Sequence, residues 1–143
     1  MINTRIVKRY ALALFGSLKA EQIEQVHQDL LAVQATIRQS KDLRTFLNSP
    51  VVPHNKKQEI FKEIYGSMVN QTSLDFLILI AEKRRESMMS EIIDSFQELY
   101  NKQMNLLPVD VTTAVEVNVD LQQKLTKKIA AITHKTVIPR FKI

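Results

Sequence analysis

The sequence predicts a mainly α-helical fold: a six-helix N-terminal bundle over residues 1–106, followed by a small, incomplete α/β unit over residues 109–143. Only two glycines, Gly16 and Gly66, interrupt the 143 residues, which favours long helices joined by short turns. Apolar residues recur at steps of three and four in the N-terminal part, as on the face of a helix. After Pro108 the pattern changes to strict alternation, which indicates a strand and therefore a domain boundary.

The first two helices are predicted from their apolar spacing. "NTRIVKRYALALFGSLK" begins with Asn3 or Thr4 as a candidate N-cap and continues with apolar residues on one helical face. Residues 21–40 form the second predicted helix. Its apolar positions are Ile23, Val26, Leu30, Val33 and Ile37.

Four further helices are predicted before the boundary. A short helix over residues 42–47 ends at "NSPVVP", because Pro50 and Pro53 block helix continuation. A fourth helix covers residues 55–65. Thr72 and Asp75 resemble a capping box that opens a fifth helix through "LDFLILIAEKRR". The sixth helix covers residues 87–106.

The C-terminal unit is predicted as strand, helix and strand. Alternation over residues 109–117 places Val109, Val111, Thr113, Val115 and Val117 on one face of the first strand. Asn118 or Asp120 can cap a helix whose apolar positions are Leu121, Leu125, Ile129 and Ile132. "TVIPRFKI" is the last strand, weakened by Pro139. These elements bury too little apolar surface to be stable alone, so the unit is expected to be incomplete.

Composition limits the class of protein. With 45% apolar residues, 24% charged residues and no long apolar run, we expect a soluble globular chain that is neither secreted nor membrane-spanning. The absence of cysteine excludes disulfides and thiolate chemistry. Of the net charge of +5, much lies at the end, where residues 124–143 hold six basic residues and no acidic one. Such an end suits an acidic protein, an anionic membrane, nucleic acid or merely solvent.

The sequence holds no pattern typical of catalysis. Two isolated glycines cannot form a phosphate-binding loop. His27, His54 and His134 lack metal-site spacing and are expected at the surface. Glu82 and Glu86 flank three basic residues, which is typical of a solvated, salt-bridged surface. We therefore expect no catalytic, cofactor-binding or metal-binding residues.

Two helices carry more apolar surface than one core contact requires. On the first helix this surface covers about 200°, and the edge formed by Ile6, Tyr10, Ala13 and Ser17 mixes small and large side chains. Such an edge could form a shallow groove for a partner helix. The fifth helix is apolar nearly all round. Central packing, or neighbours on both flanks of the first helix, would also explain the surplus.

Four segments in order resemble one family over essentially the whole chain. They are "RYALALF", "LRTFLNSPVVPHNKK", "DFLILIAEKRR" and, after the sixth helix, "VDVTTAVEV". This order resembles the delta subunit of the bacterial F-type ATP synthase, the relative of the mitochondrial oligomycin-sensitivity-conferring protein. Family members continue through a glycine-rich segment that is missing here, which agrees with an incomplete C-terminal unit.

The resemblance implies a stator subunit without an active site or cofactor, which links the catalytic head to the peripheral stalk. It implies that the bundle grips the N-terminal helix of an alpha subunit between the first and fifth helices, and that the C-terminal unit meets the C-terminus of the stalk's b subunit. The candidate contacts to the alpha subunit are Ile6, Tyr10, Ala13, Leu14, Ser17, Phe76, Leu77 and Ile80. The early first helix leaves no room for a transit peptide, so we expect the cytoplasmic side of a bacterial inner membrane, with membrane association only through the complex.

Two rival functions are each compatible with part of the sequence. An RNA-binding helical bundle agrees with the net charge of +5, but 14 basic residues face 12 acidic ones over residues 1–107, and the aromatic residues sit at core spacing. We therefore expect no nucleic-acid partner. A small enzyme using scattered carboxylates would need a pocket with a strongly perturbed carboxyl pair.

Overall fold

The structure is a computed structural model that describes residues 4–143. It divides into two units, one ending at Leu99 and one beginning at Tyr100. The division falls inside a helix, several residues before the boundary predicted at Pro108.

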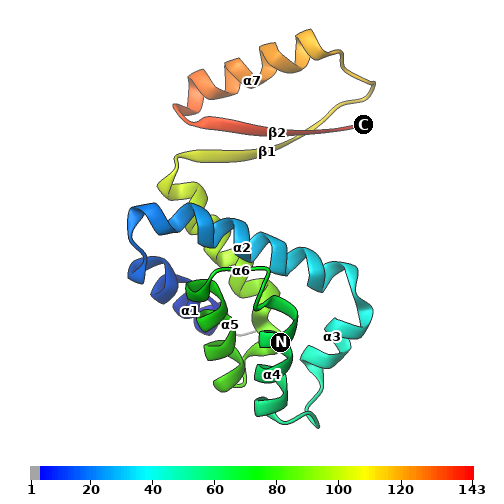
Figure 1. Cartoon of the computed structure of the whole chain (residues 1–143). Coiled ribbons are helices and arrows are strands. Elements are labelled where there is room, and N and C mark those ends of the chain that lie inside the picture. Colours follow the sequence, from blue (N-terminus) through cyan, green and yellow to red (C-terminus); the bar gives the residue numbers. More distant parts are fainter. Residues whose placement is uncertain (1–3) are drawn as a thin grey trace. The chain divides into compact units, whose positions relative to one another are not determined.

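The first unit is an α-helical bundle (Figure 1). Within the described residues six α-helices precede the first strand, so the predicted mainly α fold with a small α/β unit is confirmed. Thr4 opens the first helix, while the alternative cap Asn3 lies outside the described residues. The helices are α1 (Thr4–Ser17), α2 (Ala20–Gln39), α3 (Lys41–Asn48), α4 (His54–Tyr65), α5 (Gln71–Glu82) and α6 (Met89–Gln103), with the short 3₁₀ helix η1 (Glu86–Met88) between the last two.

The core of the bundle lies where α2 and α5 meet the other helices. All five apolar positions predicted for the second helix are buried, as expected for a helix with a single apolar face. α5 packs against α4, α2 and η1. The largest fully buried side chains of this unit include Tyr65, Phe61, Phe96, Leu30, Leu77 and Ile80.

A buried carboxylate holds the start of α5. Asp29 of α2 is only 4% exposed, and its Oδ2 accepts hydrogen bonds from the Asn70 backbone N–H (3.1 Å) and the Ser73 hydroxyl (2.7 Å). The N-cap is Asn70, whose side chain accepts from the Ser73 N–H. The prediction that Thr72 opens the helix was therefore wrong, because Asn70 and Asp29 together satisfy the first free N–H groups two residues earlier.

A buried ion pair ties the proline segment to the end of α5. Pro50 and Pro53 separate α3 from α4, as predicted. Lys57, 3% exposed, donates to the backbone oxygens of Leu47 (3.2 Å) and Ser49 (2.9 Å) and to Glu86 Oε1 (2.5 Å). Glu86 was expected on a solvated surface, which was wrong, because this lysine pairs with it in the interior.

One histidine prediction also fails. His27 is 7% exposed and its Nε2 lies 2.7 Å from Gln97 Oε1 on α6, so it belongs to the packed interior. A partner amide lets a histidine be buried on an otherwise apolar face. His54 is half-buried and His134 is exposed.

The second unit contains a two-stranded parallel sheet and one helix. β1 (Leu106–Thr112) pairs in parallel with β2 (Thr136–Lys142), and α7 (Val119–Thr133) connects them. Asn118 caps α7 by accepting from the Leu121 N–H, as predicted. In a two-stranded sheet each strand has an unpaired edge, so Pro108 and Pro139 are tolerated.

Some side-chain positions in this unit differ from the prediction. β1 begins before Pro108 and ends at Thr112, so Val115 lies outside the strand and is 71% exposed. On α7, Leu125 and Ile129 are half-buried, whereas Leu121 and Ile132 are exposed. Two strands offer α7 only a narrow surface, so its outer apolar positions remain uncovered.

Candidate functional site

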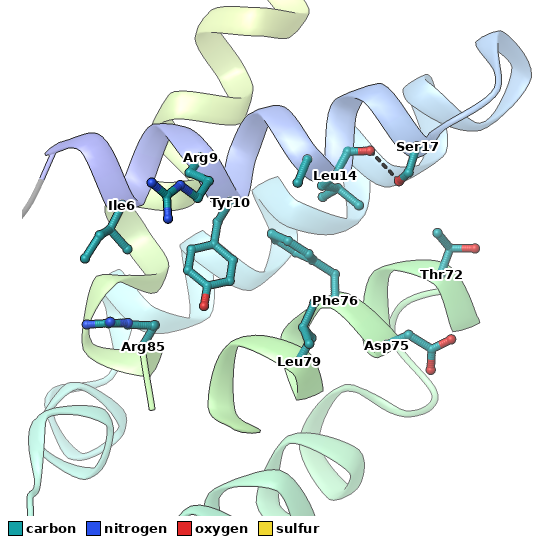
Figure 2. A pocket seen from close by; sticks show the side chains of 11 residues that line it. Ile6, Arg9, Tyr10, Leu14, Ser17, Thr72, Asp75, Phe76, Leu79 and Arg85 are labelled. Carbon is teal, nitrogen blue, oxygen red and sulfur yellow. Dashed lines mark hydrogen bonds between the residues drawn. The ribbon is translucent and has the colours of Figure 1, made fainter. Parts of the chain in front are cut away.

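An apolar groove runs between α1 and α5 in the first unit (Figure 2). Its volume is about 550 Å³. The lining residues of α1 are Ile6, Arg9, Tyr10, Ala13, Leu14 and Ser17, and those of α5 and the segment after it are Thr72, Asp75, Phe76, Leu79 and Arg85. The two helices run in opposite directions along it, so the start of α1 lies near the end of α5.

The α1 wall follows from helical spacing. Ile6, Tyr10, Ala13 and Ser17 are separated by steps of four, three and four, which places them on one face. Val7, Ala11 and Leu14 on the next arc are buried in the bundle. One arc is thus inside the bundle, with Leu14 also reaching the groove, and the other arc lines the groove, whereas Leu12 belongs to neither and is 61% exposed.

An aromatic contact anchors the remaining side of α1. Phe15 packs edge-on against Phe96 of α6, with ring centroids 5.6 Å apart. α1 is therefore held on two sides, while Tyr10 stays half-buried and Ala13 exposed at the groove. The Ser17 hydroxyl donates to the Leu14 backbone oxygen at 2.8 Å, which satisfies it within the helix.

The apolar part of the α5 wall consists of Phe76 and Leu79, so it contains only one of the three α5 residues predicted. Phe76 lines the groove, as do all five candidates on α1. Leu77 and Ile80 do not, since both are 0% exposed and belong to the core of the bundle. The side of the helix decides this: relative to Phe76, Leu79 lies about 60° to one side and lines the groove, whereas Ile80 and Leu77 lie about 40° and 100° to the other side and are buried in the core.

Five lining residues were missed by the prediction: Arg9, Thr72, Asp75, Leu79 and Arg85. A signal for three of them was present, because residues 72, 75, 76 and 79 have the i, i+3, i+4, i+7 spacing of one helical face. Leu79 is 40% exposed at the open edge of this face. Arg85 lies after the end of α5, where helical periodicity no longer applies.

The charged side chains of the groove lie at opposite ends. Figure 2 shows Arg85 near Ile6 and Tyr10, with Arg9 between these two along α1. Thr72 and Asp75 lie at the other end, near Ser17. Asp75 is exposed and accepts from Gln71 Nε2 at 2.6 Å. The apolar middle of the groove is thus bounded by two cations and one anion.

Two further searches of the described residues concern metal binding and membrane-spanning helices. Residues 4–143 contain no group of three or more His, Cys, Asp or Glu side chains able to hold a metal ion. None of the helices in this range has the length and apolar character needed to cross a membrane.

Comparisons with known proteins agree with this picture. The family model described as "ATP synthase delta (OSCP) subunit" matches residues 6–143. The ATP synthase subunit delta of Chlorobium phaeobacteroides (strain BS1) is 32% identical, over 100% of this chain and 80% of its own length. That of Prochlorococcus marinus subsp. pastoris is 34% identical over 86% of this chain and 69% of its own.

A solved structure adds the fold. A chain of the cryo-EM structure of the Toxoplasma gondii mitochondrial ATP synthase hexamer superposes with a TM-score of 0.76 and 25% identity, covering 96% of this chain and 76% of that one. The chain therefore belongs to the ATP synthase delta (OSCP) subunit family.

Proposed function

We propose that the groove between α1 and α5 binds the amino-terminal helix of an alpha subunit of the catalytic head. A member of this family is a structural, non-catalytic part of ATP synthase and a stator, which links the head to the peripheral stalk so that the head does not turn with the rotor. A stator needs a firm grip on the head. The apolar groove is the observation that carries the proposal.

The dimensions of the groove suit one helix. From Ile6 to Ser17 the α1 wall is about 16 Å long at 1.5 Å per residue, which corresponds to about three turns of a bound helix. Packed helices lie about 8 to 10 Å apart, and a small side chain at the contact allows the closer approach. Ala13, in the middle of the wall, is such a side chain. An amphipathic helix could place its apolar face against Tyr10, Phe76 and Leu79.

The second unit is the candidate contact for the end of the stalk's b subunit. Residues 124–143 contain six basic residues and no acidic one. In the same segment the side chains of Ile132 and Ile138 are 70% and 47% exposed. Exposed apolar side chains beside basic ones suit an amphipathic helix with acidic residues. Titration of the full chain with a peptide from the carboxyl-terminal end of the b protein tests this contact.

The protein is a peripheral component of a membrane-bound complex. We place it on the cytoplasmic side of a bacterial inner membrane, a proposal supported by the bacterial source of the delta subunits to which it is similar. Co-sedimentation with washed membranes, and release together with the catalytic head, tests this location.

The central test is titration of the full chain with a synthetic peptide of the alpha subunit's amino-terminal helix. We expect saturable one-to-one binding that a scrambled peptide of the same composition does not reproduce. A parallel titration with RNA at several salt concentrations addresses the rival function. Failure of the peptide to bind, together with RNA binding that weakens steeply with salt, would refute the proposal.

A further inference from the structure

We propose that the opposite charges at the two ends of the groove select the direction in which the bound helix lies. Acidic side chains of the partner lie over Arg9 and Arg85, and a basic side chain lies over Asp75. This inference rests on the proposed function and adds a preference for one direction of the bound helix, which the apolar contacts cannot supply. An apolar face can slide or turn end for end in a groove at modest cost, whereas a misplaced charge pairs with its like.

The two arginines are available for a partner. Among the described residues 4–143, neither Arg9 nor Arg85 forms an ion pair. Arg9 is exposed and Arg85 half-buried, so both can turn their guanidinium groups toward a helix above the groove. A guanidinium can bind a carboxylate through two parallel hydrogen bonds, which adds geometric selection to charge attraction.

The opposite end has the opposite charge. Asp75 lies one turn into α5 and is exposed beside Thr72. Its hydrogen bond from the neutral Gln71 amide at 2.6 Å leaves its charge uncompensated. Along α1, Arg9 and the Ser17 end of the groove are eight residues, or about 12 Å, apart, which exceeds the screening length of about 8 Å at physiological salt. Each end therefore acts on its own partner charge.

The chain offers matched variants for a test. Arg9→Glu and Arg85→Glu reverse the charge at one end, and Asp75→Lys reverses it at the other. Lys83→Glu is the control, because Lys83 is an exposed cation two residues before Arg85 that does not line the groove. Arg9 is exposed, so Arg9→Glu preserves the test if Arg85→Glu destabilises the bundle.

The probe is the synthetic alpha-subunit helix, in its native form and with each acidic residue changed singly to lysine. Arg9→Glu and Arg85→Glu should each weaken binding of the native peptide about tenfold at about 0.15 M salt, where the two ends act separately. The loss should shrink at about 1 M salt, where the screening length is about 3 Å. Lys83→Glu should leave the affinity within about twofold.

Rescue is the decisive readout. One of the acid-to-lysine peptides should bind the original chain weakly and regain affinity with Arg9→Glu or Arg85→Glu, but not with Asp75→Lys. If the native peptide binds and no reversal changes its affinity at about 0.15 M salt, or no rescue occurs, the charges do not select direction and the inference is wrong while the proposed function stands. If the native peptide does not bind the original chain at all, the proposed function fails and this inference with it.

Discussion

Replacing Ala13 by arginine separates a docking surface from ordinary packing. Ala13 is exposed in the free chain and lies midway along the α1 wall of the groove. In the free protein the new side chain can extend into solvent, so the free energy of unfolding should change by about 1 kcal/mol or less. With a helix docked about 8 to 10 Å away, the same side chain is trapped in an apolar contact.

The expected loss of affinity follows from that burial. An uncompensated charge at a closed interface costs several kcal/mol, and about 1.4 kcal/mol corresponds to a factor of ten in affinity. Ala13→Arg should therefore weaken binding of the alpha-subunit peptide at least about a hundredfold. Titration calorimetry measures the affinity, and thermal melting measures the stability of the same sample.

Two variants on the same helix serve as controls. Leu12→Arg introduces the same charge at a side chain that is 61% exposed and does not line the groove, so affinity and stability should both be preserved. Leu14→Ala removes a side chain that is only 6% exposed and should cost about 2 to 5 kcal/mol of stability through a cavity. If Ala13→Arg unfolds the bundle, Ala13 belongs to the core. If it folds and binds normally, the docking edge lies elsewhere.

Three further predictions concern the bundle itself. Residues 1–106 should fold alone, because this range contains all of α1 to α6; limited proteolysis that yields a first stable fragment ending within the bundle would contradict this. Lys57→Ala should cost about 3 to 5 kcal/mol in denaturant unfolding by leaving Glu86 buried without its cation, and a Lys57→Met, Glu86→Leu double variant should recover only part of the loss, because the backbone oxygens of Leu47 and Ser49 remain without their donor. Burial raises the pKa of Tyr65 above its ordinary 10.0, and the hydrogen bond with Thr36 opposes this rise. Tyr65 therefore ionises at a lower pH in the unfolded chain than in the folded chain. The stability that the neutral, buried hydroxyl contributes is complete below about pH 10 and is lost as pH rises above it. Tyr65→Phe should therefore reduce the dependence of the free energy of unfolding on pH in that range.

The helix order and the α1 side of the groove could be predicted because each depends on local rules. Prolines end helices by steric exclusion, and Asn118 caps the next helix wherever the rest of the chain lies. The α1 positions at the groove follow from one clear apolar arc and a second, mixed edge. Such features need no knowledge of the tertiary neighbours.

The α5 side could not be predicted in full because the helix is apolar nearly all round. Periodicity gives the angle between two residues but not which angle faces the core when no polar arc marks the outside. Leu77 and Leu79 are equally apolar, yet one is 0% exposed and the other 40%. The polar pair Thr72 and Asp75 could have marked the outer face of α5, but we interpreted the two residues as a capping box instead.

The burial of several polar residues could not be predicted from the sequence either. The interior positions of His27, Asp29 and Glu86 depend on partners 70, 44 and 29 residues away in sequence, namely Gln97, Ser73 and Lys57. No local pattern indicates such pairs. A charged residue is exposed by default, and only a partner reached through the fold reverses that expectation.

The ammonium group of Lys57 makes an arginine at this position a poor substitute. Its three N–H donors match three acceptors, the oxygens of Leu47, Ser49 and Glu86, so none remains unused. A guanidinium is planar and carries five donors in a fixed fork, which a closed tripod of acceptors cannot satisfy. The loop after α3, the start of α4 and the corner before α6 thus meet at one tetrahedral nitrogen. Retaining a positive charge at position 57 is therefore insufficient, because the tetrahedral shape of the ammonium group must be retained as well.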